Sequence, residues 1–328
     1  MSSKSRPARS AGTGLVCLAL WKAALTVAFV LPAVSGSAHR GSDQTGLRGV
    51  IQGDDARTSV DTMAHWLTQN ADPRQPRETD QYLRTTAEYA LKARNEIKVA
   101  GEVPEDIFLE FVLPYRLVDE PVDNFRKSFY DVLAPSAKKA ENLTSAVKDI
   151  VPRIFTELRA SKEVMRDKAN DTAVVFKSNQ TPAVMAPISE TLLAGYASCT
   201  GTSILIVDAL RSVGIPARVV GTPEWNIPTK GNHNWVEVWT GEGEDGWHFF
   251  DASEHNPVSL DKGWFFPGNT QHASKDDPMH KIYTATWSED ATDSEYPLTW
   301  RTPFVNWRAK DRTDFYLAAS NSATATTA

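Results

Sequence analysis

The stretch "AGYASCTGTSILIVDALRSVGIPARVV", from Ala194 to Val220, holds Cys199 at the start of an almost continuous apolar run. The run ends at Gly214 with Pro216 two residues later, which is typical of a helix C-terminus. The glycine and small polar residues around Cys199 are typical of a loop and a helix cap. We therefore predict that Cys199 begins a buried helix, where the helix dipole and free backbone N–H groups favour a thiolate and a developing oxyanion.

The N-terminus predicts export. A basic segment is followed by an apolar run over residues 15–34 and by small residues that end at Ala38. This order is typical of a secretory signal peptide over residues 1–38, cleaved near Ala38. An uncleaved N-terminal membrane anchor is the alternative, because the run approaches spanning length. Lys22 within the run and Pro32 near its end favour cleavage, so we expect a periplasmic, cell-envelope or extracellular protein.

Net charge and cysteine content limit the partners and the chemistry that we expect of this protein. Removal of residues 1–38 takes away four cations and no acidic residue, so the net charge of −6 becomes −10. Such an acidic chain argues against nucleic acid or anionic membrane surfaces as partners. The only other cysteine, Cys17, lies in the predicted signal, so the mature chain cannot form an intramolecular disulfide. Cys199 is then an intermolecular partner, an inert buried thiol or a reactive nucleophile.

The rest of the chain divides by its patterns. Residues 39–58 are polar and read as a flexible leader, and residues 59–164 have mainly helical periodicity, with a clear apolar stripe over 143–158. From residue 174 onward the patterns are mixed α and β. Residues 217–221, 234–240 and 247–253 have strand composition, and the turn "GEGEDG" joins the last two as an antiparallel hairpin. Residues 319–328 are small and polar, and predict a disordered tail.

The hairpin supplies partners for a thiolate. His233 opens one strand in "NHNWVEVW" and Asp251 closes the next in "WHFFDAS", so both lie at the same end of the hairpin. A thiolate nucleophile needs a base, and the base needs an orienting group. His248 faces away from Asp251 by strand parity. The remaining histidines lack the compact spacing of zinc ligands, and no cofactor is predicted.

These three pieces together resemble the transglutaminase-like superfamily, thiol enzymes of papain-like fold. The likeness covers about residues 190–255, through "SCTGTSILIVDALRSVGIPARVVGTPEW", "NHNWVEVW" and "GWHFFDAS". It implies an α+β domain over residues 165–318, with a nucleophile-bearing helix packed on an antiparallel sheet, after the helical region. It also implies that Cys199 is the nucleophile, His233 the base and Asp251 the orienting residue.

The sequence departs from the family elsewhere. No motif matches the family's upstream oxyanion-hole side chain, for which Gln180, Tyr196 and Asn179 are the candidates beside the backbone N–H of Cys199. No acidic loop has calcium-ligand spacing, and the paired-cysteine zinc site of peptide N-glycanases is absent from the sequence. Most tryptophans suggest core packing, but Trp225 and Trp235 are candidates for a substrate groove.

Three functions remain open at this point. The first is an exported thiol hydrolase that cleaves peptide or amide bonds of a protein or peptide substrate. The second is acyl transfer to an amine, as in true transglutaminases, which depends on whether the acyl-enzyme is shielded from water. The third is a catalytically silent module that binds envelope protein or glycan, and the complete Cys–His–Asp set argues against it.

Overall fold

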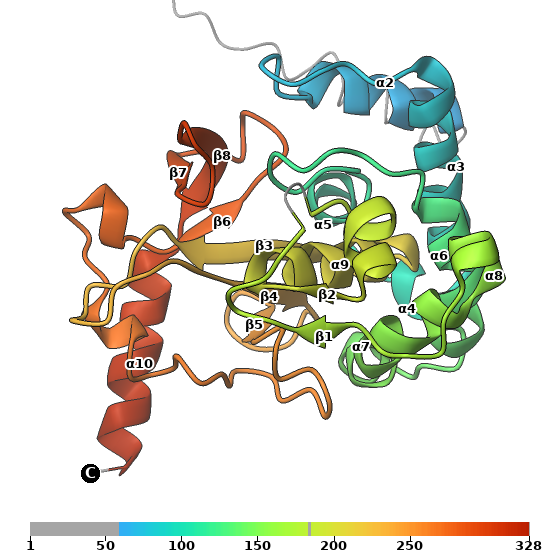
Figure 1. Ribbon diagram of the computed structural model, residues 1–328. Helices are drawn as coiled ribbons and strands as arrows, with labels where there is room; N and C mark the ends of the chain where they lie inside the picture. The colour runs from blue at the N-terminus through green and yellow to red at the C-terminus, as the bar shows by residue number, and fades with distance from the viewer. Residues whose placement is uncertain (1–58, 183–184, 328) are drawn as a thin grey trace, which may run out of the picture. The chain divides into compact units, whose positions relative to one another are not determined.

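A computed structural model describes residues 59–182 and 185–327 of the chain. The predicted signal peptide and the whole of the predicted leader lie outside these residues. The described part combines helices with a mainly antiparallel sheet, so the fold class is α+β as predicted (Figure 1). No helix within residues 59–182 and 185–327 has the length and apolar character needed to cross a membrane.

The first hundred described residues are mainly helical, as their periodicity predicts. The helices are α2 (Val60–Asn70), α3 (Asp80–Glu96), α4 (Lys98–Gly101), α5 (Glu105–Phe111), α6 (Arg126–Ala137), α7 (Leu143–Ala160) and α8 (Lys162–Met165). Side-chain caps fix where the longer ones begin. Thr79 accepts a hydrogen bond from the Tyr82 N–H at the start of α3, and Asn142 forms a capping box with Ser145 at the start of α7. Helix α7 continues through Pro152 and buries its apolar stripe.

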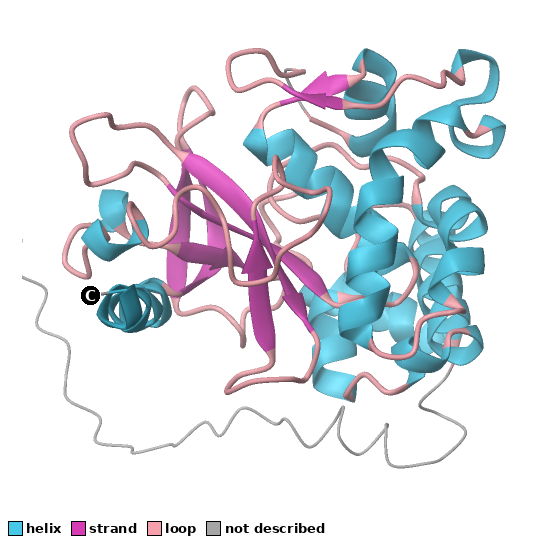
Figure 2. Ribbon diagram, turned by 90° about the horizontal axis from the view of Figure 1, so that it is seen from below, coloured by secondary structure: helices cyan, strands magenta, loops and turns pink. Residues whose placement is uncertain are grey.

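The predicted nucleophile helix is α9 (Cys199–Ser212), and it begins at Cys199. Nearly all of its residues are buried, because α6 and α7 contact it on one side and strands β3 (Ala217–Thr222) and β4 (His233–Trp239) on the other. Gly214 ends the helix with a φ of +78°, a conformation that suits glycine. A Cβ at this position would also collide with Ala100. Helix α9 therefore lies between the helical region and the sheet (Figure 2).

The main sheet has six strands in the order β5-β4-β3-β6-β8-β7, all antiparallel. The predicted hairpin is confirmed, with β4 paired to β5 (Trp247–Phe250). The remaining strands are β6 (Tyr283–Ala285), β7 (Ser294–Leu298) and β8 (Val305–Asp311). A separate pair of short parallel strands, β1 (Val175–Phe176) and β2 (Tyr196–Ala197), leads directly into Cys199. Short helical turns occupy the connections: η1 (Arg166–Lys168), the π-helix η2 (Pro187–Leu192), η3 (Thr270–His272) and η4 (Pro278–His280).

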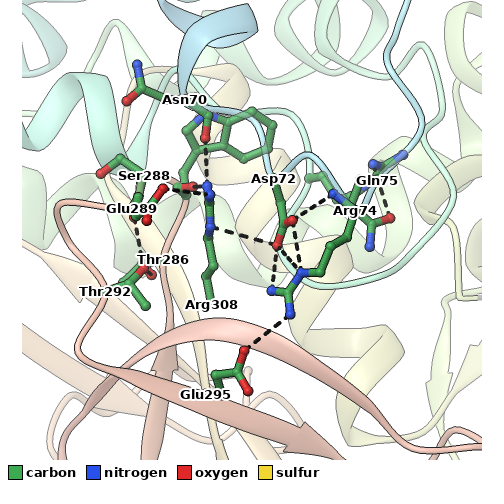
Figure 3. A network of polar contacts seen from close by, with 12 residues as sticks. Asn70, Asp72, Arg74, Gln75, Thr286, Ser288, Glu289, Thr292, Glu295 and Arg308 are labelled. Atoms are coloured by element: carbon green, nitrogen blue, oxygen red, sulfur yellow. Dashed lines mark hydrogen bonds and ion pairs between the residues drawn. The ribbon is translucent and has the colours of Figure 1, made fainter. Parts of the chain in front are cut away.

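A network of charged groups joins the helical region to the far edge of the sheet (Figure 3). Arg308 on β8 donates to the carbonyl oxygen of Asn70 at 3.0 Å and lies 3.8 Å from the Asp72 carboxylate. Arg74 pairs with Asp72 at 2.7 Å and with Glu295 on β7 at 3.2 Å. The connection between α2 and α3 is therefore attached to β7 and β8.

The C-terminal segment differs from the sequence prediction. Residues expected to form a disordered tail belong to helix α10 (Thr313–Thr327). Tyr316 and Ser320 are fully buried, and the Ser320 hydroxyl lies 2.7 Å from that of Thr270. Tyr316 packs with Trp235 and Phe249 on the face of the sheet opposite α9. Tertiary packing of one helix face thus orders a segment whose composition alone favours disorder.

Candidate active site

The structure brings Cys199, His233 and Asp251 together. His233 begins β4, and Asp251 directly follows β5. The register pairs Val236 with Phe250, so Asp251 leaves the hairpin beside the start of β4. His233 Nε2 lies 2.6 Å from Asp251 Oδ2, and the ring also hydrogen-bonds the thiol of Cys199.

Burial and hydrogen bonds hold this set in place. His233 is 4 % and Asp251 1 % exposed, whereas Cys199 is half-buried. The second carboxylate oxygen of Asp251 accepts a bond from the Ser253 N–H at 2.7 Å and another from the Ser253 hydroxyl. The aromatic rings of Trp235, Phe265 and Trp264 lie 5.0–5.8 Å from the imidazole ring. The imidazole can therefore exchange a proton with Cys199 while Asp251 fixes its orientation.

The surroundings shift the pKa of all three groups toward an ion pair. Burial would raise the pKa of the Cys199 thiol, but the hydrogen bond and charge of His233, the backbone N–H of Asn234 and the Thr200 hydroxyl lower it below its ordinary value. Burial would lower the pKa of His233, yet its bonds to Asp251 and Cys199 raise it to about 9. Burial opposes ionisation of Asp251, but the His233 contact dominates and lowers its pKa. The favoured state is a thiolate beside an imidazolium.

A second set of buried polar residues, not found from the sequence, lies beside Cys199. Asn234 Nδ2 donates to Thr200 Oγ1 at 2.8 Å, and the Tyr296 hydroxyl donates to Asn234 Oδ1 at 2.7 Å. All three side chains are at least 98 % buried. Strand alternation next to His233 places Asn234 on the α9 face of the sheet, but no local pattern points to Tyr296 on β7.

A cavity of about 380 Å³ opens at Cys199. Apart from Cys199 and His233, its lining is aromatic, apolar or neutral: Phe176, Ser178, Thr181, Met185, Ser198, Thr200, Asn232, Trp264 and Trp300. No Asp, Glu, Lys or Arg is among these described lining residues. Trp264 is 54 % exposed at the cavity, and the indole N–H of Trp300 is buried with no acceptor in the described part of the chain. The sequence shows both only as members of a tryptophan-rich region.

The other candidates from the sequence lie apart from this cavity. Trp235 is fully buried and donates its indole N–H to the Tyr316 hydroxyl at 2.7 Å, and Trp225 stacks on it at 6.0 Å. Tyr196 carries the Lys177 ammonium over its ring, and Gln180 accepts a hydrogen bond from the same lysine. None of the four lines the cavity. Trp225 and Trp235 instead pack behind His233.

The described part of the chain offers no set of ligands for a metal ion. No group of three or more His, Cys, Asp or Glu side chains within residues 59–182 and 185–327 is placed to hold a metal ion. The second His–Asp contact of the sheet, His248 Nδ1 to Asp261 Oδ2 at 2.7 Å, lies outside the cavity. Strand parity predicts this separation of His248 from Asp251.

The part of the chain that holds these residues is similar to a known protein family. Residues 137–252 match the family described as the transglutaminase-like superfamily. No curated protein matches the chain. Among solved structures, a "Putative Cysteine Protease" from Cytophaga hutchinsonii has a TM-score of 0.33 and 17 % identity over 66 % of this chain and 68 % of that one. The family match begins within the helical region and contains Cys199, His233 and Asp251. Residues 137–252 are thus similar to the transglutaminase-like superfamily.

Proposed function

We propose that this chain is a thiol hydrolase that cleaves amide bonds of peptides or proteins through Cys199, His233 and Asp251. The observation that carries the proposal is the contact of one imidazole with both the thiol of Cys199 and the carboxylate of Asp251. A buried imidazole with these two partners can hold a proton and return it, which acyl transfer requires.

The reaction would run in two halves. The Cys199 thiolate attacks the carbonyl carbon, and the backbone N–H of Cys199 at the start of α9 donates to the oxygen as it becomes negative. The His233 imidazolium then gives its proton to the leaving nitrogen as the C–N bond breaks, which leaves a thioester on Cys199. Water attacks the thioester carbonyl, His233 takes up a proton from this water, and release of the acid restores the thiolate and the imidazolium. Asp251 stabilises the imidazolium in both halves.

The cavity lining supports an uncharged substrate segment. A charged side chain next to the scissile bond would lose water and gain no ionic partner from the described lining residues, which is costly. An aromatic or aliphatic side chain would instead gain contacts with Trp264, Phe176 and Met185. We therefore expect cleavage next to apolar residues, and weak binding of peptides with Lys or Glu there.

Labelling with a thiol-reactive probe tests the nucleophile. Wild-type protein and the matched control Cys17→Ala should both be labelled and should cleave apolar peptides, whereas Cys199→Ala should do neither. Incorporation of a labelled amine in place of hydrolysis would make the enzyme an acyltransferase. Labelling at Cys199 with no turnover of either kind on cell-envelope proteins and peptides would contradict an enzymatic function and favour a binding module.

We also propose that the protein is exported and processed near Ala38. The support is the basic, apolar and small-residue order of residues 1–38, all outside the described structure. N-terminal sequencing of protein from the cell envelope or medium should then begin near His39. Full-length cytosolic protein that starts at Met1 would contradict export, and full-length protein in the membrane would support the anchor.

A further inference from the structure

The hydrogen bonds behind Cys199 have a defined direction. Burial holds the pKa of Tyr296 well above its ordinary value, so its hydroxyl stays protonated and donates to Asn234 Oδ1. The Asn234 amide then presents its NH2 group to Thr200, and Nδ2 donates to Oγ1 at 2.8 Å. A threonine hydroxyl has one hydrogen. Since Oγ1 accepts from Asn234, this hydrogen is free to point at the sulfur.

The fold gives this chain of bonds a dedicated space. Gly221 on β3 pairs with Asn234 on β4. A Cβ at Gly221 would collide with the Tyr296 hydroxyl oxygen and the Asn234 side-chain oxygen. The missing side chain on β3 therefore lets β7 reach across to β4, although the two strands are not neighbours in the sheet. Asn234 also contributes its backbone N–H to the sulfur.

We propose that the chain Tyr296–Asn234–Thr200 directs the Thr200 hydroxyl hydrogen at the Cys199 sulfur and so stabilises the thiolate. Thr200 is then a catalytic residue, because it contacts the reacting atom. Asn234 and Tyr296 act through it as positioning residues. The inference rests on the proposed role of Cys199 as nucleophile. It adds to the role of Asp251, because Asp251 orients the imidazole of His233 and the chain Tyr296–Asn234–Thr200 donates a hydrogen bond to the sulfur of Cys199.

The Thr200 hydroxyl stabilises the Cys199 thiolate because the sulfur that accepts its hydrogen bond is charged. A hydrogen bond to an ionised group is stronger than one to a neutral group, and each bond in a chain polarises the next. The titratable groups that face the sulfur are His233 from β4 and Tyr296 from β7. Removal of the Thr200 hydroxyl changes neither of them, so its effect on the thiolate can be measured separately.

The test is the rate of Cys199 alkylation by iodoacetamide against pH, on the full chain and without substrate. Thr200→Val, which keeps the shape but lacks the hydroxyl, should raise the midpoint by about 1–2 pH units. Thr200→Ser keeps the hydroxyl and should retain the wild-type midpoint. Tyr296→Phe should give a smaller shift in the same direction, because the donor at the far end is lost.

The outcomes separate this inference from the proposed function. A wild-type midpoint near that of a free cysteine would contradict the activated nucleophile itself. A lowered wild-type midpoint that is the same in folded Thr200→Val and Thr200→Ser would overturn only the role of the hydroxyl. If Thr200→Val does not fold, Tyr296→Phe decides, and an unchanged midpoint there overturns the inference.

Discussion

Removal of the Asp251 carboxylate should shift the ionisation of His233 by a predictable amount. The carboxylate oxygen lies 2.6 Å from Nε2, and both side chains are almost fully buried, so solvent screens the contact little. A hydrogen bond between charged groups in such a place contributes about 1.5–3 kcal/mol. At 1.36 kcal/mol per unit, Asp251→Ala should lower the pKa of His233 from about 9 to about 7–8.

The sign follows from which form Asp251 stabilises. The negative carboxylate favours the imidazolium, so the imidazolium persists until the pH passes about 9 and should be lost earlier without Asp251. The same contact stabilises the fold fully below the pKa of an unfolded histidine, and this contribution should fade as the pH rises through about 9. The alkaline limb of the turnover profile should therefore move down with the pKa of His233.

Two measurements check this prediction. NMR of the His233 ring protons gives its pKa directly, and the pH profile of kcat/KM gives the alkaline limb. Asp261→Ala is a matched control, because it removes the partner of His248 at 2.7 Å on the same sheet but outside the cavity. It should leave both readouts of His233 at wild-type values. A folded Asp251→Ala protein whose His233 still titrates near 9 would refute the assigned contact.

Three further predictions concern the surroundings of the site. Tyr316→Phe leaves the Trp235 indole N–H buried without an acceptor and removes a 2.8 Å bond to Glu237, so it should lower the free energy of unfolding in urea by about 2–4 kcal/mol. Asn321→Ala, at an exposed position of the same helix, should lower it little, and equal stability of the two variants would contradict the role of α10. Trp264→Ala should raise KM for apolar peptides about tenfold without moving the alkylation midpoint, and an unchanged KM would exclude contact with substrate. Met185→Glu should improve cleavage next to Lys relative to Phe, and an unchanged preference would exclude Met185 from side-chain selection.

The proximity of Cys199, His233 and Asp251 could be predicted because its sequence signals are local. An apolar run that follows small polar residues places Cys199 at the start of α9, and a hairpin turn fixes where His233 and Asp251 meet. The environment of the site depends on contacts between distant segments. Trp235 lies on the same face of β4 as His233, but nothing local in the sequence tells that α10 covers this face and buries Trp235.

Dependence on distant contacts also explains why the sequence predicts a disordered tail where the structure has helix α10. Residues 319–328 are small and polar, and nothing in them favours order by itself. Tyr316 in the first turns of α10 is buried against Trp235 and Phe249, and this contact supplies the energy that orders the helix. Likewise, no pattern around Asn234 predicts that Tyr296, 62 residues later, completes its hydrogen bonds.

The position of Tyr316 in the chain also means that the support behind β4 is synthesised late. Tyr316 follows Trp235 by 81 residues, so a ribosome has made Cys199, His233 and Asp251 well before it makes the support behind β4. Until α10 emerges, Trp235 and Glu237 lack the phenol that joins them. A nascent or prematurely terminated chain thus carries Cys199, His233 and Asp251 while strand β4, which begins at His233, lacks the support of α10. The contacts that join β4 to the C-terminal helix therefore form only once α10 is present.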